Sequence, residues 1–427
     1  MTISCRTWAR AGRPPELIAA IRFAPQAPPI AWLTGLAGAG ARPLSAPRDP
    51  GDESSIVALL LMLALALAYW QVASYRQRRL LYAAWRRTVR WEYWPLWAFY
   101  LPVVLYVLAL SLRHRGLTLV SVVNPGLDRG GVALVSKSVL LTRLAREPGR
   151  VAPFVLIPPQ ADSGRKRAML TALMAEHGLS YPIVLKPDLG ERGRAVRIVA
   201  DEAEALAVLD RCSEPMLAQQ YVSGREYGVY YMRHPAEARG RILALTAKDA
   251  AYVIGDGTRT LERLILDDPR LVCYGRLLLG EFADRLGEVV PAGERFVLTE
   301  LRSHWRGAQF SDVEELRTPQ LEQAFLDLAR HLDGFFVGRY DVRAPSPRTM
   351  RSGDGFKVIE LNSVMSEPIH MYDARYGVLD AYRIMFGLWR RIIAIGAENR
   401  ARGARPLGPA AFARLILDYR AHRRAQS

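Results

Sequence analysis

The chain has 427 residues, half of them apolar and 23% charged, which excludes a wholly disordered protein and allows one large domain or two to three smaller ones. Lysine and arginine total 58 against 42 aspartates and glutamates, a formal net charge of +16. Only five lysines occur, so the basic excess is nearly all arginine and each lysine is a candidate for a specific role: Lys137, Lys166, Lys186, Lys248 and Lys357.

The three cysteines, Cys5, Cys212 and Cys273, have no metal-ligand spacing and cannot form a disulfide framework. They exclude a cysteine-built zinc site and suit a reducing compartment. Residues 1–53 are rich in Ala, Pro, Gly and Arg, so we expect a disordered extension, or translated sequence upstream of a start at Met62.

Residues 54–112 contain two apolar segments, Ile56–Ala73 and Trp94–Leu112, that carry no charge and are long enough to span a bilayer. Pro102 lies inside the second segment, which predicts a kink or a helix start near Leu101. For both segments the alternative is a buried core helix.

The linker Ser74–Tyr93 holds six arginines and should lie in the cytoplasm. If both segments spanned the membrane, the remainder of the chain would lie outside, where there is no ATP. We therefore favour a first segment that spans and a second that lies in the interface or re-enters. The alternative is that both span and the arginine loop breaks the rule.

From residue 116 onward, strand and helix patterns alternate, which predicts an α/β protein. Strands are expected at Leu117–Val123, Phe154–Ile157 and Ile183–Lys186, and helices at Lys137–Leu144 and Arg165–His177. Later segments are expected to be β-rich at 217–233 and 242–254, helical at 259–285 and 319–333, strands at 335–343 and 356–362, and helical at 377–402 and 409–424.

A lysine ends the strand before a loop that contains Gly190 and Gly193, and a further strand, Val196–Val199, follows. Glycines let backbone N–H groups close around phosphate oxygens, and Lys186 adds a point charge. This pattern predicts a phosphate site, against the alternative of a plain hairpin with a surface lysine.

A second candidate lies at 217–229, where two strand-like runs flank Gly224-Arg225-Glu226. Such a hinge can offer backbone groups to an adenine edge, and Glu226 can accept hydrogen bonds from ribose hydroxyls. The alternative is a hairpin with a solvated turn.

The segments 338–342 and 358–362 alternate with period two, so Arg339 and Asp341 share one strand face, as do Glu360 and Asn362. Val342, Ile359 and Leu361 are expected to face a core. Pairing the strands gathers three hard oxygen ligands, Asp341, Glu360 and Asn362, which predicts Mg²⁺ with substrate phosphates. The alternative is an exposed face of mixed charge.

These three elements, in this order, resemble the ATP-grasp superfamily, which includes D-alanine–D-alanine ligase, glutathione synthetase and cyanophycin synthetase. The resemblance covers residues 117–390 and implies an α+β (α/β) fold whose two subdomains clasp ATP. It implies that Arg339 contacts the transferring phosphate and that Asp341, Glu360 and Asn362 bind two Mg²⁺ ions, for which Mn²⁺ can substitute. The remaining matches are implied to bind ATP: Lys186, Gly190, Gly193, Gln219, Tyr221, Val222 and Glu226.

A fourth stretch, Lys248 with Gly255-Asp256-Gly257, resembles the cyanophycin and glutathione synthetase branch and makes Lys248 a second phosphate contact. Gln219 stands where many relatives have a glutamate. The sequence after Asn362 lacks the Pro-Gly turn of D-alanine–D-alanine ligases, which puts specificity for D-alanine in doubt.

Substrate candidates are His304, Arg306, Glu367 and His370, with a packed or solvated histidine as the alternative for each histidine. The loop 124–131, with Lys137 just beyond it, is expected to close over the substrate, or else to be a plain loop. The basic tail 391–427 suits anionic lipid better than nucleic acid because its aromatics are not interleaved with its arginines. A solvated helix face is the alternative.

The predicted domains are the extension 1–53, the membrane region 54–112, a short α/β unit 113–180, the ATP-grasp domain 181–390 and the tail 391–427. The resemblance implies a ligase that activates the carboxylate of a small molecule or peptide as an acyl phosphate for attack by an amine, and the apolar segments together with the need for ATP place it at the cytoplasmic face of a membrane. The alternatives are a phosphotransferase with a hydroxyl acceptor and a non-catalytic ATP sensor. No nucleic-acid partner is expected, and a homo-oligomer is left open.

Overall fold

The computed structural model describes residues 50–190, 195–299 and 307–425. The chain divides into two units, Met1–Val72 and Ala73–Ser427. In the first unit the described part is one helix, α1 (Pro50–Val72). The predicted apolar helix is thus present, but it begins at Pro50, so residues 50–53 belong to it. The rest of the predicted extension lies outside the described residues.

The second unit opens with α2 (Tyr75–Val89) and α3 (Leu96–Arg113). A capping box between Ser74 and Gln77 starts α2. Of the two alternatives predicted for Pro102, a helix start near Leu101 is wrong, because α3 begins at Leu96 and continues through Pro102. Within the described residues, α3 is the one helix long and apolar enough to cross a membrane by length and composition.

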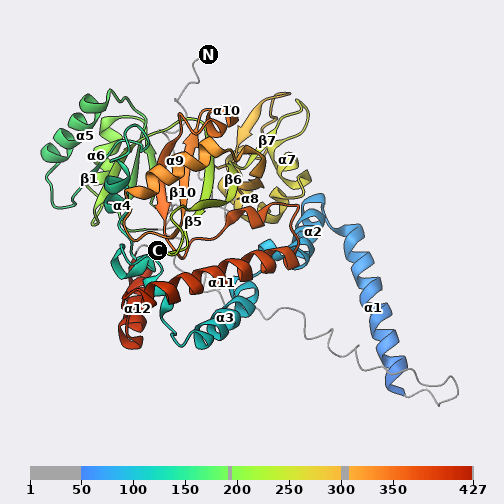
Figure 1. The fold of residues 1–427 in the computed structure, drawn as a ribbon. Helices are drawn as coiled ribbons and strands as arrows, with labels where there is room; N and C mark the ends of the chain where they lie inside the picture. Colours follow the sequence, from blue (N-terminus) through green and yellow to red (C-terminus); the bar gives the residue numbers. More distant parts are fainter. Residues whose placement is uncertain (1–49, 191–194, 300–306, 426–427) are drawn as a thin grey trace. The chain divides into compact units, whose positions relative to one another are not determined.

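The first sheet, sheet B, has four antiparallel strands in the order β1-β4-β2-β3, and helices α5 and α6 pack against it (Figure 1). Its core is aliphatic, with Ile183, Leu185 and Ala218 fully buried. The bounds are β1 (Phe154–Ile157), β2 (Ile183–Pro187), β3 (Arg197–Val199), β4 (Met216–Gln220), α5 (Ser163–His177) and α6 (Glu202–Leu209).

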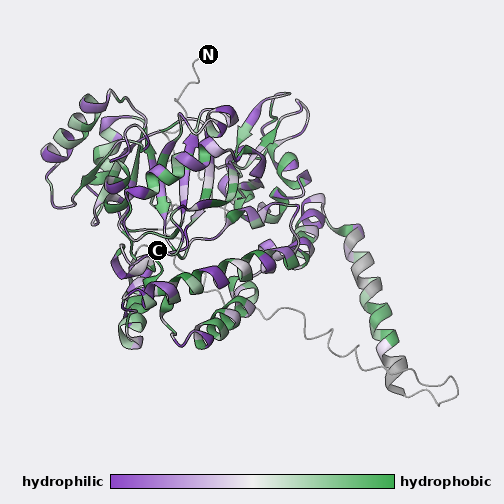
Figure 2. Cartoon of the chain, in the orientation of Figure 1, coloured by the Kyte–Doolittle hydropathy of each residue, from purple (hydrophilic) through white to green (hydrophobic). Residues whose placement is uncertain are grey.

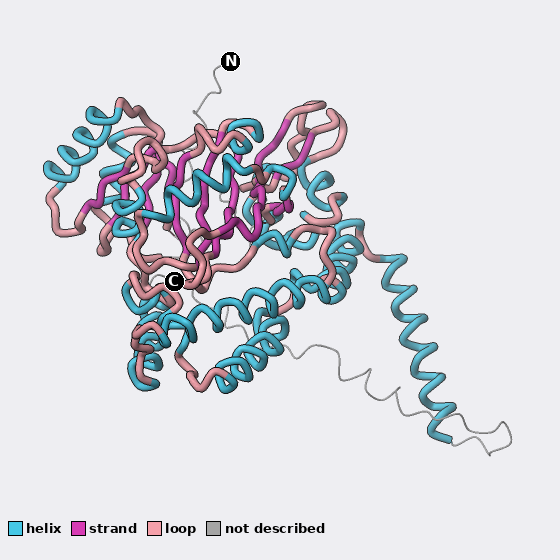
Figure 3. Tube along the Cα trace, viewed as in Figure 1, coloured by secondary structure: helices cyan, strands magenta, loops and turns pink. Residues whose placement is uncertain are grey.

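The second sheet, sheet A, has five antiparallel strands in the order β11-β10-β5-β6-β9. Figure 3 draws the strands in magenta, with helices in cyan around them. Helix α9 covers one face with its apolar stripe, and the cap Thr318 followed by Pro319 fixes where it begins. The bounds are β5 (Arg225–Met232), β6 (Arg241–Asp249), β9 (Gln309–Asp312), β10 (Val337–Ala344), β11 (Lys357–Asn362), α9 (Pro319–Arg330) and α10 (Pro347–Arg351).

The remaining elements complete the second unit. The segment that connects strands β6 and β9 of sheet A forms a small two-stranded sheet and two short helices, which share one apolar cluster. Three further helices lie outside the sheets. The bounds are α4 (Lys137–Leu144), β7 (Tyr252–Ile254), α7 (Leu261–Asp267), α8 (Gly275–Glu281), β8 (Arg295–Val297), α11 (Val378–Ala401) and α12 (Pro409–Ala425).

Two predictions about the region before β2 are wrong. The segment Leu117–Val123 forms no strand but a 3-10 helix, Leu119–Val122. Apolar residues there are buried irrespective of parity, including Leu119, Val122 and Val123, because the segment packs beneath α11 and not on a sheet. The boundary predicted at residue 180 also divides sheet B, since β1 pairs with β4.

Candidate active site

Strands β10 and β11 bring the predicted metal ligands together. In their antiparallel register Arg339 lies opposite Asn362, and Asp341 lies opposite Glu360. These four side chains therefore share one face of sheet A, while Tyr340 and Leu361 are buried on the other. The prediction that the two strands pair in this way is confirmed.

A bulge corrects one detail of that prediction. The register shifts after Asp341, so that Val342 lies opposite Val358 and Ile359 is the extra residue of β11. Ile359, which we expected in the core, is only half-buried, and Val358 occupies the core position instead. The bulge leaves the carbonyl of Ile359 available to a side chain from sheet B.

Asp341 is the centre of the cluster. Its Oδ1 lies 2.9 Å from Arg339 Nε and 2.8 Å from Lys248 Nζ, and its Oδ2 accepts a 3.0 Å hydrogen bond from Asn362. Lys248 also lies 3.0 Å from Glu226 Oε1. The predicted catalytic cations, Arg339 and Lys248, are therefore already placed around the predicted metal ligand.

Gly228 makes this arrangement possible, and sequence reasoning missed it. It lies opposite Asp341 on the neighbouring strand β5. A Cβ there would approach the side chains of Ile369, Arg339 and Lys248 to 2.9, 3.2 and 3.4 Å. A glycine is needed because the stems of both cations pass over this position.

The charges of the cluster support one another. Burial alone would raise the pKa of the Asp341 carboxyl, but the charges of Arg339 and Lys248 outweigh it and hold that pKa below its usual value. Burial likewise opposes the charge of Arg339, yet Asp341 raises the pKa of that guanidinium. Both groups are therefore ionised when the site is assembled.

Lys186 reaches the cluster from sheet B. It stands near the end of β2, is 6% exposed, and donates a 2.7 Å hydrogen bond to the carbonyl of Ile359. Burial lowers the pKa of Lys186 to about 8. The alternative of a surface lysine on a plain hairpin is excluded by this burial.

A second lysine, Lys137 at the start of α4, lies beside the first. Its ammonium donates to the carbonyls of Pro187, Asp188 and Gly190, at 2.6 Å for Gly190, and lies 4.0 Å from Glu360 Oε1. It therefore fixes the start of the predicted phosphate loop. The scarcity of lysine was the signal for it, since three of the five lysines meet here. Gly193 lies outside the described residues.

The predicted hinge joins the two sheets. Gln219 lies on β4 of sheet B and Glu226 on β5 of sheet A, so the segment between them is no hairpin turn. Gln219 is buried and donates to the carbonyl of Ala152 at 3.3 Å. The ribose and adenine roles of Gln219, Tyr221, Val222 and Glu226 stay predictions.

Arg343 organises the far side of this hinge. Its guanidinium donates to the carbonyl of Val222 at 2.8 Å, lies 3.5 Å from Glu226 Oε2 and faces the ring of Tyr221 at 5.3 Å. It shares the face of Arg339 and Asp341, two residues further along β10, which a period-two pattern could have indicated.

Of the predicted substrate residues, Glu367 lies at the cluster. Its backbone carbonyl accepts from Arg339 at 3.1 Å, and its carboxylate accepts hydrogen bonds from Tyr372, at 2.9 Å, and Tyr100. The ring of His370 instead lies edge-on against Tyr376, 5.9 Å away, and burial lowers its pKa. His304 and Arg306 lie outside the described residues.

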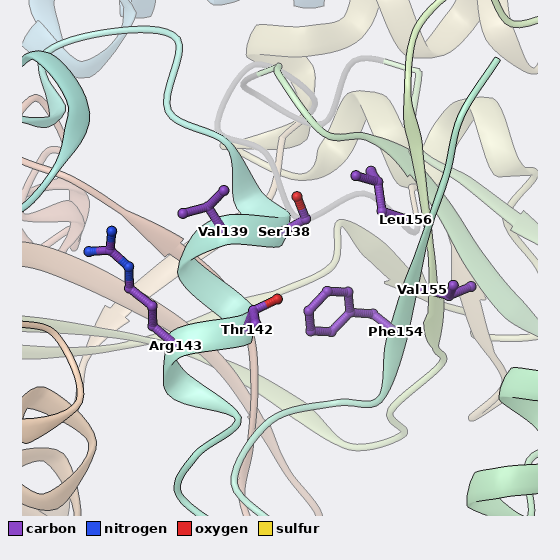
Figure 4. A pocket seen from close by; sticks show the side chains of 7 residues that line it. All are labelled: Ser138, Val139, Thr142, Arg143, Phe154, Val155 and Leu156. Carbon is purple, nitrogen blue, oxygen red and sulfur yellow. The ribbon is translucent and has the colours of Figure 1, made fainter. Parts of the chain in front are cut away.

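A shallow hollow of about 530 Å³ lies between α4 and β1 (Figure 4). The charged residue in it, Arg143, donates to the carbonyl of Gly126. The hollow adjoins the site through Ser138, next to Lys137, but its lining offers no carboxylate. It is formed by Ser138, Val139, Thr142, Arg143, Phe154, Val155 and Leu156.

The predicted ligands suit a hard cation. Two carboxylates and one amide oxygen are a donor set that Mg²⁺ accepts together with phosphate oxygens and water. Among the described residues no three His, Cys, Asp or Glu side chains form a group that could hold a metal. The set of Asp341, Glu360 and Asn362 differs from such a group because its third member is an asparagine.

No family model matches the sequence, and no curated protein matches it either. Among solved structures, the bifunctional glutathione synthetase from Pasteurella multocida is 17% identical, over 59% of this chain and 36% of that chain, with a TM-score of 0.35. The D-alanine–D-alanine ligase from Bacillus anthracis is 14% identical, over 65% of this chain and 71% of that chain, with a TM-score of 0.38.

A third match, the ATP-grasp ligase PsnB complexed with minimal precursor, is 13% identical, over 61% of this chain and 60% of that chain, with a TM-score of 0.34. The chain is thus similar to ligases of the kind that its sequence resembles. Because these TM-scores are low, the chemistry rests on the site described above.

Proposed function

We propose that the chain is an ATP- and Mg²⁺-dependent ligase that joins a carboxylate, of a small molecule or peptide, to an amine. One observation carries the proposal. Asp341, Glu360 and Asn362 share a sheet face with Arg339 and Lys248, and Lys186 from the other sheet ends at the same place. Anionic oxygens next to three cations fit a metal-bound polyphosphate.

In the first step, an oxygen of the substrate carboxylate attacks the γ-phosphorus of ATP and ADP leaves. In the second step, the lone pair of the neutral amine nitrogen attacks the carbonyl carbon of the acyl phosphate, the bond from that carbon to the phosphate oxygen breaks, and phosphate leaves with the proton that the amine loses. Lys186 and Lys248 hold phosphate oxygens, and Arg339 stabilises the charge that develops on the transferring group. Magnesium supplies charge neutralisation of the phosphates when bound to Asp341, Glu360 and Asn362.

The test is trapping with hydroxylamine, because an acyl phosphate yields a hydroxamate and a phosphate ester does not. The full chain should form a hydroxamate from MgATP and one carboxylate of a panel. The variant Glu360→Gln should lose roughly a hundredfold or more of this rate with the fold intact. Glu398→Gln, whose side chain pairs with Arg402 on the surface of α11, is the matched control and should keep it.

Wild-type rates in Glu360→Gln would remove the metal assignment. A phosphate ester without hydroxamate would establish the phosphotransferase instead. Tight ATP binding with no turnover on any carboxylate would support the alternative that the chain is a non-catalytic ATP sensor.

We also propose that α1 anchors the chain in a membrane with the second unit in the cytoplasm. The uncharged run Ile56–Ala73 and the arginines of the following linker support this orientation. Protease protection of the linker in right-side-out vesicles is the measurement, and cleavage there from outside would reverse the orientation.

A further inference from the structure

Helix α3 has one apolar face that packs inward. Phe99 and Val103 are buried and share a cluster with Ala381 and Met385 of α11. The ring of Phe99 stacks on that of Tyr382 at 5.0 Å. The two helices therefore lie side by side within the second unit (Figure 1).

The opposite face of α3 is also apolar, and it is exposed. No charged residue occurs between Pro95 and Leu112, and Figure 2 colours this helix largely as hydrophobic. The exposed side chains recur at helical spacing and form one stripe, which we call the α3 stripe: Trp97, Leu101, Val104, Leu105, Leu108 and Leu112, exposed by 63, 55, 49, 58, 45 and 66%. A stripe of this size marks an interaction surface.

Arginines border the stripe at both ends. Arg87 and Arg90 precede it, Arg113 and Arg115 follow it, and all four are exposed. Apolar residues flanked by arginines suit a bilayer with anionic headgroups. A second copy of the chain would instead bring like charges together. The charge pattern therefore favours lipid as the occupant.

The neighbour of α3 indicates how the helix meets the lipid. Helix α11 carries the exposed Arg383, Arg390 and Arg391 along its length. If α3 crossed the bilayer, these arginines would enter the hydrocarbon beside it, at high cost. A helix that lies flat in the interface leaves them at the headgroups.

The inward face of α3 also reaches the candidate active site. Tyr100 donates to the carboxylate of Glu367, whose backbone carbonyl accepts from Arg339. The neighbouring Leu101 belongs to the α3 stripe. Because a helix with its side chains is about 10 Å across, Glu367 lies about one helix diameter from the lipid.

We infer that α3 lies flat in the cytoplasmic leaflet and that the amine substrate is an amphiphile whose tail stays in the bilayer while its amino group meets Glu367. A carboxylate that accepts from two tyrosine hydroxyls keeps lone pairs for the N–H groups of the neutral amine that attacks. The inference rests on the proposed function for its chemistry, and the covalent step is the amine attack given above.

The position of α3 is tested with nitroxide labels on the full chain in phosphatidylglycerol vesicles. Native cysteines become serine, and single cysteines are placed at Trp97, Leu101, Leu105, Leu108 and Leu112, with Val289→Cys on the loop before β8 as the exposed control. Equal depth in the acyl region for the five α3 labels, with Val289 in water, is the expected result.

Three other results would overturn this position. Depth greatest at Leu105 and shallow at both ends means a spanning helix. Labels shielded from oxygen and from a polar relaxant mean that α1 or a second copy covers the stripe. Labels open to the polar relaxant mean that water covers it.

The substrate class is tested by ADP release with the carboxylate panel. The double variant Leu101→Glu/Leu105→Glu should lose more than about tenfold in rate with phosphatidylethanolamine vesicles and nothing with soluble ethanolamine. Val289→Glu, at an exposed apolar position outside α3 and the basic tail, is the matched control and should lose neither rate. Glu367→Gln should lose both rates.

Equal rates of the double variant and the wild type on vesicles would contradict the proposal that the amine substrate is an amphiphile held in the bilayer. Hydroxamate formation needs no amine, so its absence counts against the proposed function alone. Hydroxamate formation without stimulation by the amine lipid counts against this inference alone.

Discussion

The two sheets treat charge in opposite ways. Sheet A holds Asp341, Arg339 and Lys248 in contacts of 2.8–2.9 Å, so buried charges of opposite sign cancel locally. Sheet B contributes Lys186, which donates a hydrogen bond to the neutral carbonyl of Ile359 and whose pKa is lowered by burial. The buried charges of sheet A are thus compensated without a ligand. The charge of Lys186 in sheet B is instead expected to be stabilised when an anionic ligand binds.

The largest effect should follow from breaking the charge balance of sheet A. Asp341→Asn removes a metal ligand and leaves Arg339 and Lys248 without their shared carboxylate. Turnover should fall roughly a thousandfold, and the free energy of unfolding should fall by about 3 kcal/mol, because cations remain buried and less compensated. Hydroxamate formation and denaturant unfolding measure the two effects.

The matched control is Asp354→Asn, since Asp354 pairs with Arg150 at 3.2 Å but its side chain is 84% exposed. That variant should match the wild type in both measurements. A stable Asp341→Asn protein would mean that Arg339 and Lys248 need no anionic partner.

The next variant should change stability in the opposite direction from Asp341→Asn. Lys186→Met should weaken MgATP binding by about thirtyfold or more and yet raise the melting temperature of the ligand-free protein by a few degrees, because a desolvated charge is removed. Isothermal titration and calorimetry measure the two. Lys166, equally buried but 2.8 Å from Asp210, is the control, and Lys166→Met should lower the melting temperature and leave ATP binding unchanged.

The same lysine predicts a pH dependence. The pKa of Lys186 falls from 10.5 in the free side chain to about 8 in the folded chain. Between these values the unfolded state binds more protons, so the free energy of unfolding from this group rises with pH from 8 to 10.5. Lys186→Met should remove that rise, and an unchanged pH profile in the variant would contradict the assignment.

Much of the fold was predictable because the local sequence pattern agreed with which residues are buried. Helix Lys137–Leu144 and strand Phe154–Ile157 have the predicted bounds, and the β10–β11 face follows from period two. The segment 117–123 failed because its burial comes from α11, a neighbour far away in the sequence. Ile359 failed because a bulge is a property of a strand pair and not of one strand.

The site was predictable where residue type and spacing both carried meaning, as for Asp341 and Glu360. Gly228 and Tyr100 were not, since their roles depend on which side chains cross a neighbouring strand and on where α3 packs. Lys137 lay between these cases, because its rarity was visible in the sequence and its partners were not.

A smaller effect should come from the edge of the charged network. Glu226→Gln keeps one acceptor for Lys248 but removes the charge that faces Lys248 and Arg343. We expect the KM for ATP to rise about tenfold with kcat little changed, as for a lost hydrogen bond between charged groups. Glu237→Gln, on the exposed loop after β5, is the control. A fall in kcat with KM constant would move Glu226 from nucleotide binding to the transferring phosphate.

The smallest effect connects sheet A to α3. Tyr100→Phe keeps the ring against Phe99, at 5.3 Å, and removes only the hydroxyl that donates to Glu367. One hydrogen bond to a carboxylate that Tyr372 still holds should cost about threefold to fivefold in kcat/KM for the amine, with ATP binding unchanged. Tyr106→Phe on the same helix, whose ring packs on Phe386 at 4.6 Å, is the control and should lose nothing. Because the hydroxamate reaction uses no protein-bound amine, it should run at the wild-type rate in both variants; a slower hydroxamate rate in Tyr100→Phe alone would place Glu367 in the phosphoryl-transfer step.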